Sequence, residues 1–153
     1  TEMKNADIKI RRRHLPHWTM EGATYFVTFR TKKIKLRPDE RAAILANLKE
    51  GHKKYYLLSA ATVLPDHTHV IITPKSSYDL SHILKGIKGN TAKEINRRRK
   101  TTGSVWQADS FDRIIRDEEE FVEKMNYIIN NAVKKALSDD PYDYSGLYIT
   151  EDK

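Results

Sequence analysis

The 153-residue sequence predicts an α+β fold, a ferredoxin-like split βαβ sandwich with an antiparallel sheet and an extra C-terminal helix. Two observations support this class. Segments of strand and helix periodicity follow one another in the order strand, helix, strand, strand, helix, strand, helix. Only two residues separate the second and third strands, which indicates a hairpin, whereas the other strands are joined through helical segments.

The first strand is predicted over 24–31, where Tyr25, Val27 and Phe29 place apolar side chains on one face. A helix should begin at Pro38, because proline suits the first helical turn and the acidic residues that follow it complement the helix dipole.

Residues 55–64 and 67–73 form the predicted hairpin, since Pro65 and Asp66 between them are typical turn residues. A long helix should begin at Asp79. Its apolar stripe recurs every three or four residues and consists of Leu80, Ile83, Leu84, Ile87, Thr91 and Ile95.

Gly103 is expected to interrupt the chain after this helix. Residues 104–107 and 111–115 are predicted as one bulged strand or two short strands. The last helix should begin at Arg116 or Asp117 and run to about Leu137, before a segment with two aspartates and Pro141 ends it.

Composition predicts a basic protein without thiol chemistry. Lysine and arginine total 28 against 21 acidic residues, and there is no cysteine, which excludes thiolate zinc sites and cysteine nucleophiles. The apolar runs are no longer than strands and the N-terminal region is polar, so we expect neither a membrane span nor a signal peptide, and a cytoplasmic location.

The uneven charge divides the chain into a basic N-terminal arm (1–22), one domain (23–138) and an acidic C-terminal tail (139–153). Basic residues cluster at 11–13 and again at 97–100. Either cluster alone is compatible with an ordinary solvated surface. Two clusters in one small domain favour a nucleic acid over a membrane as the partner.

His67 and His69 are the most informative pair in the sequence. On a strand they project from the same face, while Thr68 turns away. Two imidazoles side by side are half of a metal site, and a solvated strand face is the alternative. A third ligand elsewhere in the chain would favour the metal site.

The last helix contains a tyrosine where packing does not require one. At about 100° per residue its core face consists of Phe121, Met125, Ile128, Ala132 and Ala136, and Tyr127 lies nearly opposite. Asn131 follows Tyr127 after one turn. A carboxamide oxygen is a hard metal ligand, and tyrosine is a nucleophile beside a metal-polarised phosphate. The alternative is an amphipathic tyrosine that lies over the sheet.

Together these residues resemble the single-tyrosine HUH transposases, and more closely their REP-associated branch. The resemblance covers most of the chain, from the first strand to the last helix. It rests on Pro-Asp-His-Thr-His-Val at 65–70, Val-Trp-Gln at 105–107, Phe111, Arg116, Asp117, Tyr127, Ile128, Asn131 and Val133.

The resemblance implies a metal-dependent transposase of cytoplasmic bacterial origin that cleaves and rejoins single-stranded DNA near hairpins. Tyr127 would attack the phosphodiester and form a 5′-phosphotyrosine intermediate, and His67, His69 and Asn131 would bind Mg²⁺ or Mn²⁺. Two positions depart from the family pattern. Thr68 replaces the usual bulky hydrophobic residue, and Ala132 stands where the REP-associated branch typically has proline.

Single-stranded hairpin DNA is the implied partner, bound by a monomer or a homodimer. Cationic side chains would contact phosphate and aromatic ones would stack on bases. The predicted contacts are Arg11, Arg12, Arg13, His17 and Trp18 on the arm, and Lys85, Lys88 and Arg99 on the helix that begins at Asp79. A core position for Trp18 is an equal alternative.

Three other functions compete with this one. A catalytically silent hairpin-DNA-binding regulator would keep the fold without needing the histidines, the tyrosine and the asparagine that are all present. A ferredoxin-like RNA-binding module would need exposed aromatic side chains on the central strands. A metal-dependent hydrolase would not need Tyr127.

Overall fold

A computed structural model describes residues 22–151 of the chain. Within this range an antiparallel sheet has the strand order β4-β1-β3-β2-β5, which confirms the predicted α+β class. The elements are β1 (Thr24–Arg30), α1 (Pro38–Gly51), β2 (Tyr56–Val63), β3 (His67–Pro74), α2 (Leu80–Arg99), β4 (Phe111–Ile115), α3 (Glu118–Lys134), a 3₁₀ helix (Pro141–Asp143) and β5 (Leu147–Ile149).

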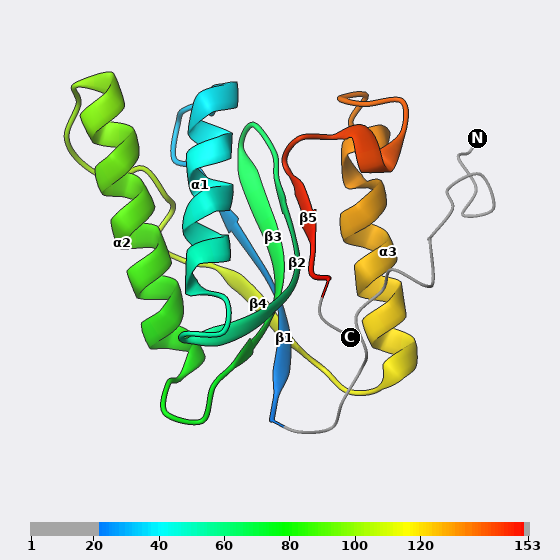
Figure 1. The fold of residues 1–153 in the computed structure, drawn as a ribbon. Helices are drawn as coiled ribbons and strands as arrows, with labels where there is room; N and C mark the ends of the chain where they lie inside the picture. Colours follow the sequence, from blue (N-terminus) through cyan, green and yellow to red (C-terminus); the bar gives the residue numbers. More distant parts are fainter. Residues whose placement is uncertain (1–21, 152–153) are drawn as a thin grey trace.

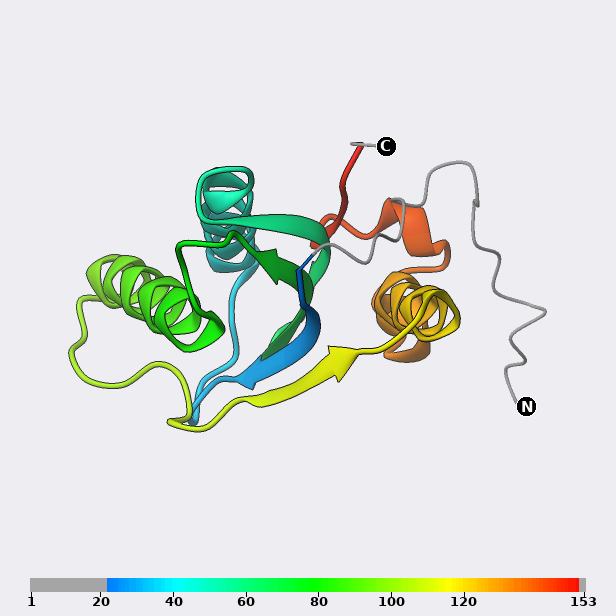
Figure 2. The same cartoon turned by 90° about the horizontal axis from the view of Figure 1, so that it is seen from below.

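Helices cover both faces of the sheet. Helices α1 and α2 pack on one face and α3 packs on the other, as the two views in Figures 1 and 2 show. Two hydrophobic cores result, one on each side of the sheet. No helix of the described residues has the length and apolar character that a membrane span requires.

Strand β3 lies at the centre of the sheet between β1 and β2, and its side chains alternate between the two cores. Val70 and Ile72 belong to the core beneath α1 and α2, whereas Ile71 belongs to the core beneath α3. His67 and His69 have the same parity as Ile71. Both histidines therefore lie on the face that α3 covers.

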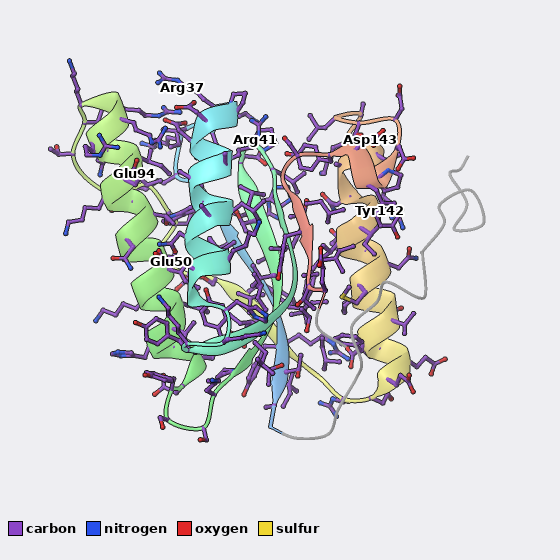
Figure 3. The ribbon with its side chains drawn as sticks, in the orientation of Figure 1. Arg37, Arg41, Glu50, Glu94, Tyr142 and Asp143 are labelled. Carbon is purple, nitrogen blue, oxygen red and sulfur yellow. The ribbon has the colours of Figure 1, made fainter. Side chains whose placement is uncertain are left out.

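The segment predicted as an acidic tail contains a 3₁₀ helix and the strand β5, which sequence reasoning missed. The 3₁₀ helix lies beside the upper end of α3, where Figure 3 labels Tyr142 and Asp143. Strand β5 pairs with β2, and the buried Tyr144 hydroxyl donates to the Val63 carbonyl at 2.6 Å. Three residues are too few to show strand periodicity in a sequence.

One predicted helix end and one predicted strand were wrong. Helix α3 ends at Lys134 rather than near Leu137, because Ala136 adopts a left-handed φ of 60°. Ala136 is exposed as a result and leaves the predicted core face. Residues 104–107 form a loop with a single bridge from Trp106 to Thr31, so β4 stands alone as a strand.

An ion pair between α1 and α2 joins the two helices of one layer. Glu40 is fully buried in the first turn of α1, and its carboxylate accepts hydrogen bonds from Arg99 Nε at 2.7 Å and Nη2 at 2.8 Å. The guanidinium of Arg99 holds the pKa of Glu40 below its usual value. Asp39, one residue earlier, pairs with Arg98 at the exposed surface.

We expect Glu40→Ala to lower the free energy of unfolding by about 3 kcal/mol, since it leaves the Arg99 charge without a partner in a partly buried position. Asp39→Ala is the matched control on the same helical turn, and its exposed pair should contribute little. Urea unfolding monitored by circular dichroism measures both. Equal effects of the two substitutions would contradict a special role for the Glu40–Arg99 pair.

Candidate active site

His67 and His69 lie side by side on β3, beneath α3, and both are buried. Their ring centroids are 4.7 Å apart. Position 69 pairs with Thr28 of β1 and Thr62 of β2, which places the second imidazole in the middle of the sheet. The solvated strand face, the alternative in the sequence analysis, is therefore wrong.

The two imidazoles are oriented by hydrogen bonds at their Nδ1 atoms. His67 Nδ1 donates to Asp66 Oδ1 at 2.7 Å, and His69 Nδ1 lies 2.7 Å from Thr28 Oγ1. Each ring therefore has its Nε2 left for another partner. A carboxylate or hydroxyl behind a histidine is the usual arrangement at metal sites, because it sets the ring orientation and the tautomer.

Burial keeps both imidazoles neutral. Desolvation lowers the pKa of His67, although the Asp66 carboxylate opposes the shift. Desolvation also lowers the pKa of His69 from 6.5 to about 3, and the charges of His67, Arg30 and Lys135 add to the effect. Neutral imidazole is the form that binds a metal ion.

Helix α3 supplies a third candidate ligand from the opposite side. Asn131 is buried, and α3 packs against β2 and β3. Within the described residues, the buried Oδ1 of Asn131 has no hydrogen-bond partner, and neither does the buried Nε2 of His69. Such atoms carry a cost unless something binds them. Neutral nitrogen and oxygen donors of this kind fit a divalent cation such as Mn²⁺ or Mg²⁺.

Of the three candidate ligands, His67 and His69 are imidazoles and Asn131 is an amide. Among residues 22–151, no group of three or more His, Cys, Asp or Glu side chains is placed to hold a metal ion. The candidate site therefore depends on Asn131. The neighbouring Asn130 is also buried, and its Oδ1 likewise lacks a hydrogen-bond partner within the described residues, but its Nδ2 donates to the Asn126 carbonyl at 2.9 Å.

Tyr127 lies at the solvent side of the histidine pair. Its ring centroid is 5.1 Å from that of His69 and 5.8 Å from that of Phe26, and the side chain is 41% exposed. Phe26 in turn stacks on His69. Tyr127 therefore packs against Phe26 of β1 and His69 of β3, and it remains accessible to a substrate. Asn131 follows one turn later on the same helix.

A groove of about 720 Å³ opens beside Tyr127. It is lined by Phe26, Thr28, Arg30, Gln107, Asp109, Ser110, Phe111, Lys124 and Tyr127. Lys124 Nζ lies 5.0 Å from the Phe26 ring, and Lys134 Nζ lies 5.7 Å from the Tyr127 ring. These cations make the groove suitable for a phosphate chain.

Sequence reasoning missed Arg30 and Lys135, which lie close enough to lower both histidine pKa values. The strand alternation contained a signal for Arg30, since this residue shares a face with Phe26 and Thr28. Lys135 lies beyond the end of α3, where helical periodicity no longer predicts direction.

Some of the predicted DNA contacts lie outside the described residues, and the others lie on α2. Arg11, Arg12, Arg13, His17 and Trp18 lie outside the described residues. Lys85 is exposed and lines a groove of about 770 Å³ between α2 and the 104–112 segment.

Lys88 and Arg99 are engaged within the fold and do not match the free phosphate contacts that the sequence suggested. Lys88 Nζ donates to the Gln107 carbonyl at 2.8 Å and to Ser110 Oγ at 3.0 Å. Arg99 is paired with Glu40. Helical periodicity shows that both side chains point away from the apolar stripe, but it cannot show which loop or helix lies there.

Residues 25–131 match the family model described as "Transposase IS200 like". The chain matches no curated protein significantly. A REP-associated tyrosine transposase bound to a REP hairpin is similar in structure, with 21% identity, a TM-score of 0.67 and coverage of 86% of this chain and 79% of that chain.

A putative transposase from Deinococcus radiodurans R1 shows 19% identity and a TM-score of 0.48, with coverage of 70% of this chain and 88% of that one. At these identities, the first structure supports the fold only. The family match is broader evidence, because it spans the sheet strands β1 to β4 and α3 as far as Asn131. This chain belongs to the IS200-like transposase family.

Proposed function

We propose that this protein is a metal-dependent transposase that cleaves and rejoins single-stranded DNA near hairpins, through a 5′-phosphotyrosine intermediate at Tyr127. The main support is the exposed Tyr127 ring beside His69, whose buried Nε2 has no partner. Family membership agrees with this chemistry. The hairpin held by the structurally similar REP-associated transposase supports hairpin DNA as the substrate.

His67, His69 and Asn131 would hold Mg²⁺ or Mn²⁺, because they present neutral donors from two rigid elements. A bound ion supplies Lewis-acid polarisation of the scissile phosphate. Asp66 and Thr28 keep the imidazoles in the required orientation. Burial disfavours the charged imidazolium form of both histidines and so keeps their Nε2 atoms available as metal donors.

In the proposed cleavage step, Tyr127 Oη forms a bond to the phosphorus atom and the bond from phosphorus to the 3′ oxygen breaks. The phenol loses its proton, and the departing 3′ oxygen takes up a proton and leaves as a hydroxyl. Because the new phosphotyrosine bond keeps the energy of the old phosphodiester, the same 3′ hydroxyl or another one can attack it and rejoin DNA without a nucleotide cofactor.

Cations around the groove would stabilise the charge of the substrate. Arg30 and Lys124 line the groove, and Lys134 lies over the Tyr127 ring. They act on the negative charge that accumulates on the phosphate oxygens during the transfer. The RNA-binding alternative finds less support, because helices cover both faces of the sheet and Phe26 and Phe29 are buried.

We expect a covalent protein–DNA adduct when the full chain is incubated with labelled hairpin single strands and Mn²⁺, and we expect Tyr127→Phe to abolish it. The phenylalanine ring keeps the contacts with Phe26 and His69 but lacks the attacking oxygen. Denaturing gel electrophoresis detects the adduct. Adduct formation by Tyr127→Phe at the wild-type rate would refute the assigned nucleophile.

We expect Asn131→Ala to weaken Mn²⁺ binding by about tenfold or more, because it removes one of three proposed ligands. Asn130→Ala is the matched control, since Asn130 is the adjacent buried amide and is bonded to Asn126. Isothermal titration calorimetry measures both affinities. If the two variants bind Mn²⁺ equally, Asn131 is not a ligand.

We expect Mn²⁺ affinity to fall less between about pH 7.5 and about pH 6.0 than it would for two exposed imidazoles, because burial lowers both histidine pKa values from 6.5. Two exposed imidazoles with a pKa of 6.5 would lose about tenfold in affinity over this range.

The same pKa shifts predict the stability of the metal-free protein. The unfolded chain binds protons at His69 below pH 6.5 and the folded chain does not until about pH 3, so stability falls as the pH decreases through this window. Urea unfolding at several pH values measures the effect. A free energy of unfolding that stays constant as the pH falls from 6.5 to about 3 would show that His69 takes up its proton at the same pH in the folded protein as in the unfolded chain.

A further inference from the structure

A third cavity lies at the opposite end of the β2–β3 hairpin from His67 and His69. Its volume is about 510 Å³, and it is lined by Asn47, Glu50, Gly51, Lys54, Tyr55, Tyr56, Tyr78, His82, Ile83, Gly86, Ile87 and Asn90. Glu50, which Figure 3 labels beside the lower half of α1, marks its position between α1 and α2. The cavity and Tyr127 lie on different faces of the sheet.

Two loops at the rim combine lysines with exposed tyrosines. We call residues 52–55 and 75–79 the lysine–tyrosine loops. Lys75 joins them, because its backbone N–H donates to the Tyr55 carbonyl at 3.0 Å and its Nζ donates to the Lys53 carbonyl. Tyr55 and Tyr78 meet edge to face at 5.2 Å and are 47% and 37% exposed.

Tyr55 and Tyr78 each keep more than a third of their surface exposed, although they pack against each other. A tyrosine that only supports packing buries its ring and exposes its hydroxyl. Tyr56, the neighbour of Tyr55, shows the contrast, since it is buried and its hydroxyl donates to the Leu48 carbonyl at 2.7 Å. The two rim rings instead offer aromatic surface to solvent.

Polar groups inside the cavity are available for a ligand. Asn47 on α1 and Asn90 on α2 present carboxamides that make no hydrogen bond with another described residue, and the ring of His82 makes none either. Gly86 widens the cavity, because a Cβ built there meets no atom within 4 Å. Glycine inside a helix is less stable than alanine, and no packing contact compensates for it here.

We propose that this cavity binds one unpaired base of the single-stranded DNA substrate. Exposed aromatic rings stack on a base whatever its identity, and carboxamides form hydrogen bonds with base edges. Lys54 lies on the first of the lysine–tyrosine loops and lines the cavity, where it can contact a flanking phosphate. The inference rests on the proposed function, because it takes single-stranded DNA as the substrate.

The position of the cavity has a consequence for the substrate. Strand β3 runs from His69 to Pro74 between the two sites, which is about 17 Å along the strand. A single DNA strand that reaches both Tyr127 and this cavity must pass around the end of the sheet from one face to the other. A dinucleotide around the scissile phosphate therefore reaches Tyr127 but not this cavity.

Hairpins that carry 2-aminopurine in the loop, in a bulge or in the single-stranded flank test the proposal. Binding to the full chain is measured by fluorescence in excess EDTA, so that no cleavage occurs. We expect quenching of 2-aminopurine at one unpaired position, because the base stacks on a tyrosine. The double variant Tyr55→Ala/Tyr78→Ala should lose the quenching and about tenfold in affinity.

Two further variants test whether the effect is specific to the aromatic rings of Tyr55 and Tyr78. Tyr55→Phe/Tyr78→Phe keeps both rings and should retain the quenching and most of the affinity. Leu57→Ala removes an exposed apolar side chain outside the cavity and should leave binding unchanged. Thermal unfolding of each variant confirms that it is folded.

Several outcomes would overturn the proposal. These are unchanged affinity in the double alanine variant, equal affinity for a hairpin with an abasic site at the quenched position, or an equal loss for a fully paired duplex.

Adduct formation is scored separately with Mn²⁺. Normal base binding without an adduct refutes the proposed transposase chemistry alone. A normal adduct with no effect of the tyrosine variants on binding refutes the base-binding cavity alone.

Discussion

Successive side chains of β3 point to opposite faces of a sheet that helices cover on both sides, so each residue of this strand is committed to one of two cores. Val70 and Ile72 anchor the layer of α1 and α2, and Ile71 anchors α3. The same alternation holds His67 and His69 at a fixed spacing beneath α3. A shift of one residue in register would move both histidines to the other core.

Helix α3 completes the candidate site because it carries two functional side chains on adjacent turns. Its apolar side chains, which include Met125 and Ile128, pack on the sheet and determine the rotation of the helix. This rotation places Tyr127 beside His69 and buries Asn131. Nucleophile and proposed metal ligand are thus positioned by one packing interface, and disturbing the interface changes both together.

The sequence predicts those features that follow from local periodicity. It predicts the sheet and its helices, the common face of the histidines, and the one-turn spacing of Tyr127 and Asn131. Features that depend on contacts between residues far apart in the sequence could not be predicted from it. Periodicity cannot show that Arg99 meets Glu40, that Lys88 binds the 107–110 loop, or that residues 147–149 extend the sheet.

The outer edge of β4 is one of the two edges of the described sheet, since this strand pairs with β1 alone; β5, which pairs with β2 alone, forms the other. Unpaired strand edges can recruit a second chain and start aggregation. Strand β4 has only five residues, and Asp112 and Arg113 interrupt its apolar side chains with charges of both signs. A protein that must present an open groove beside this strand therefore stays resistant to edge-to-edge association.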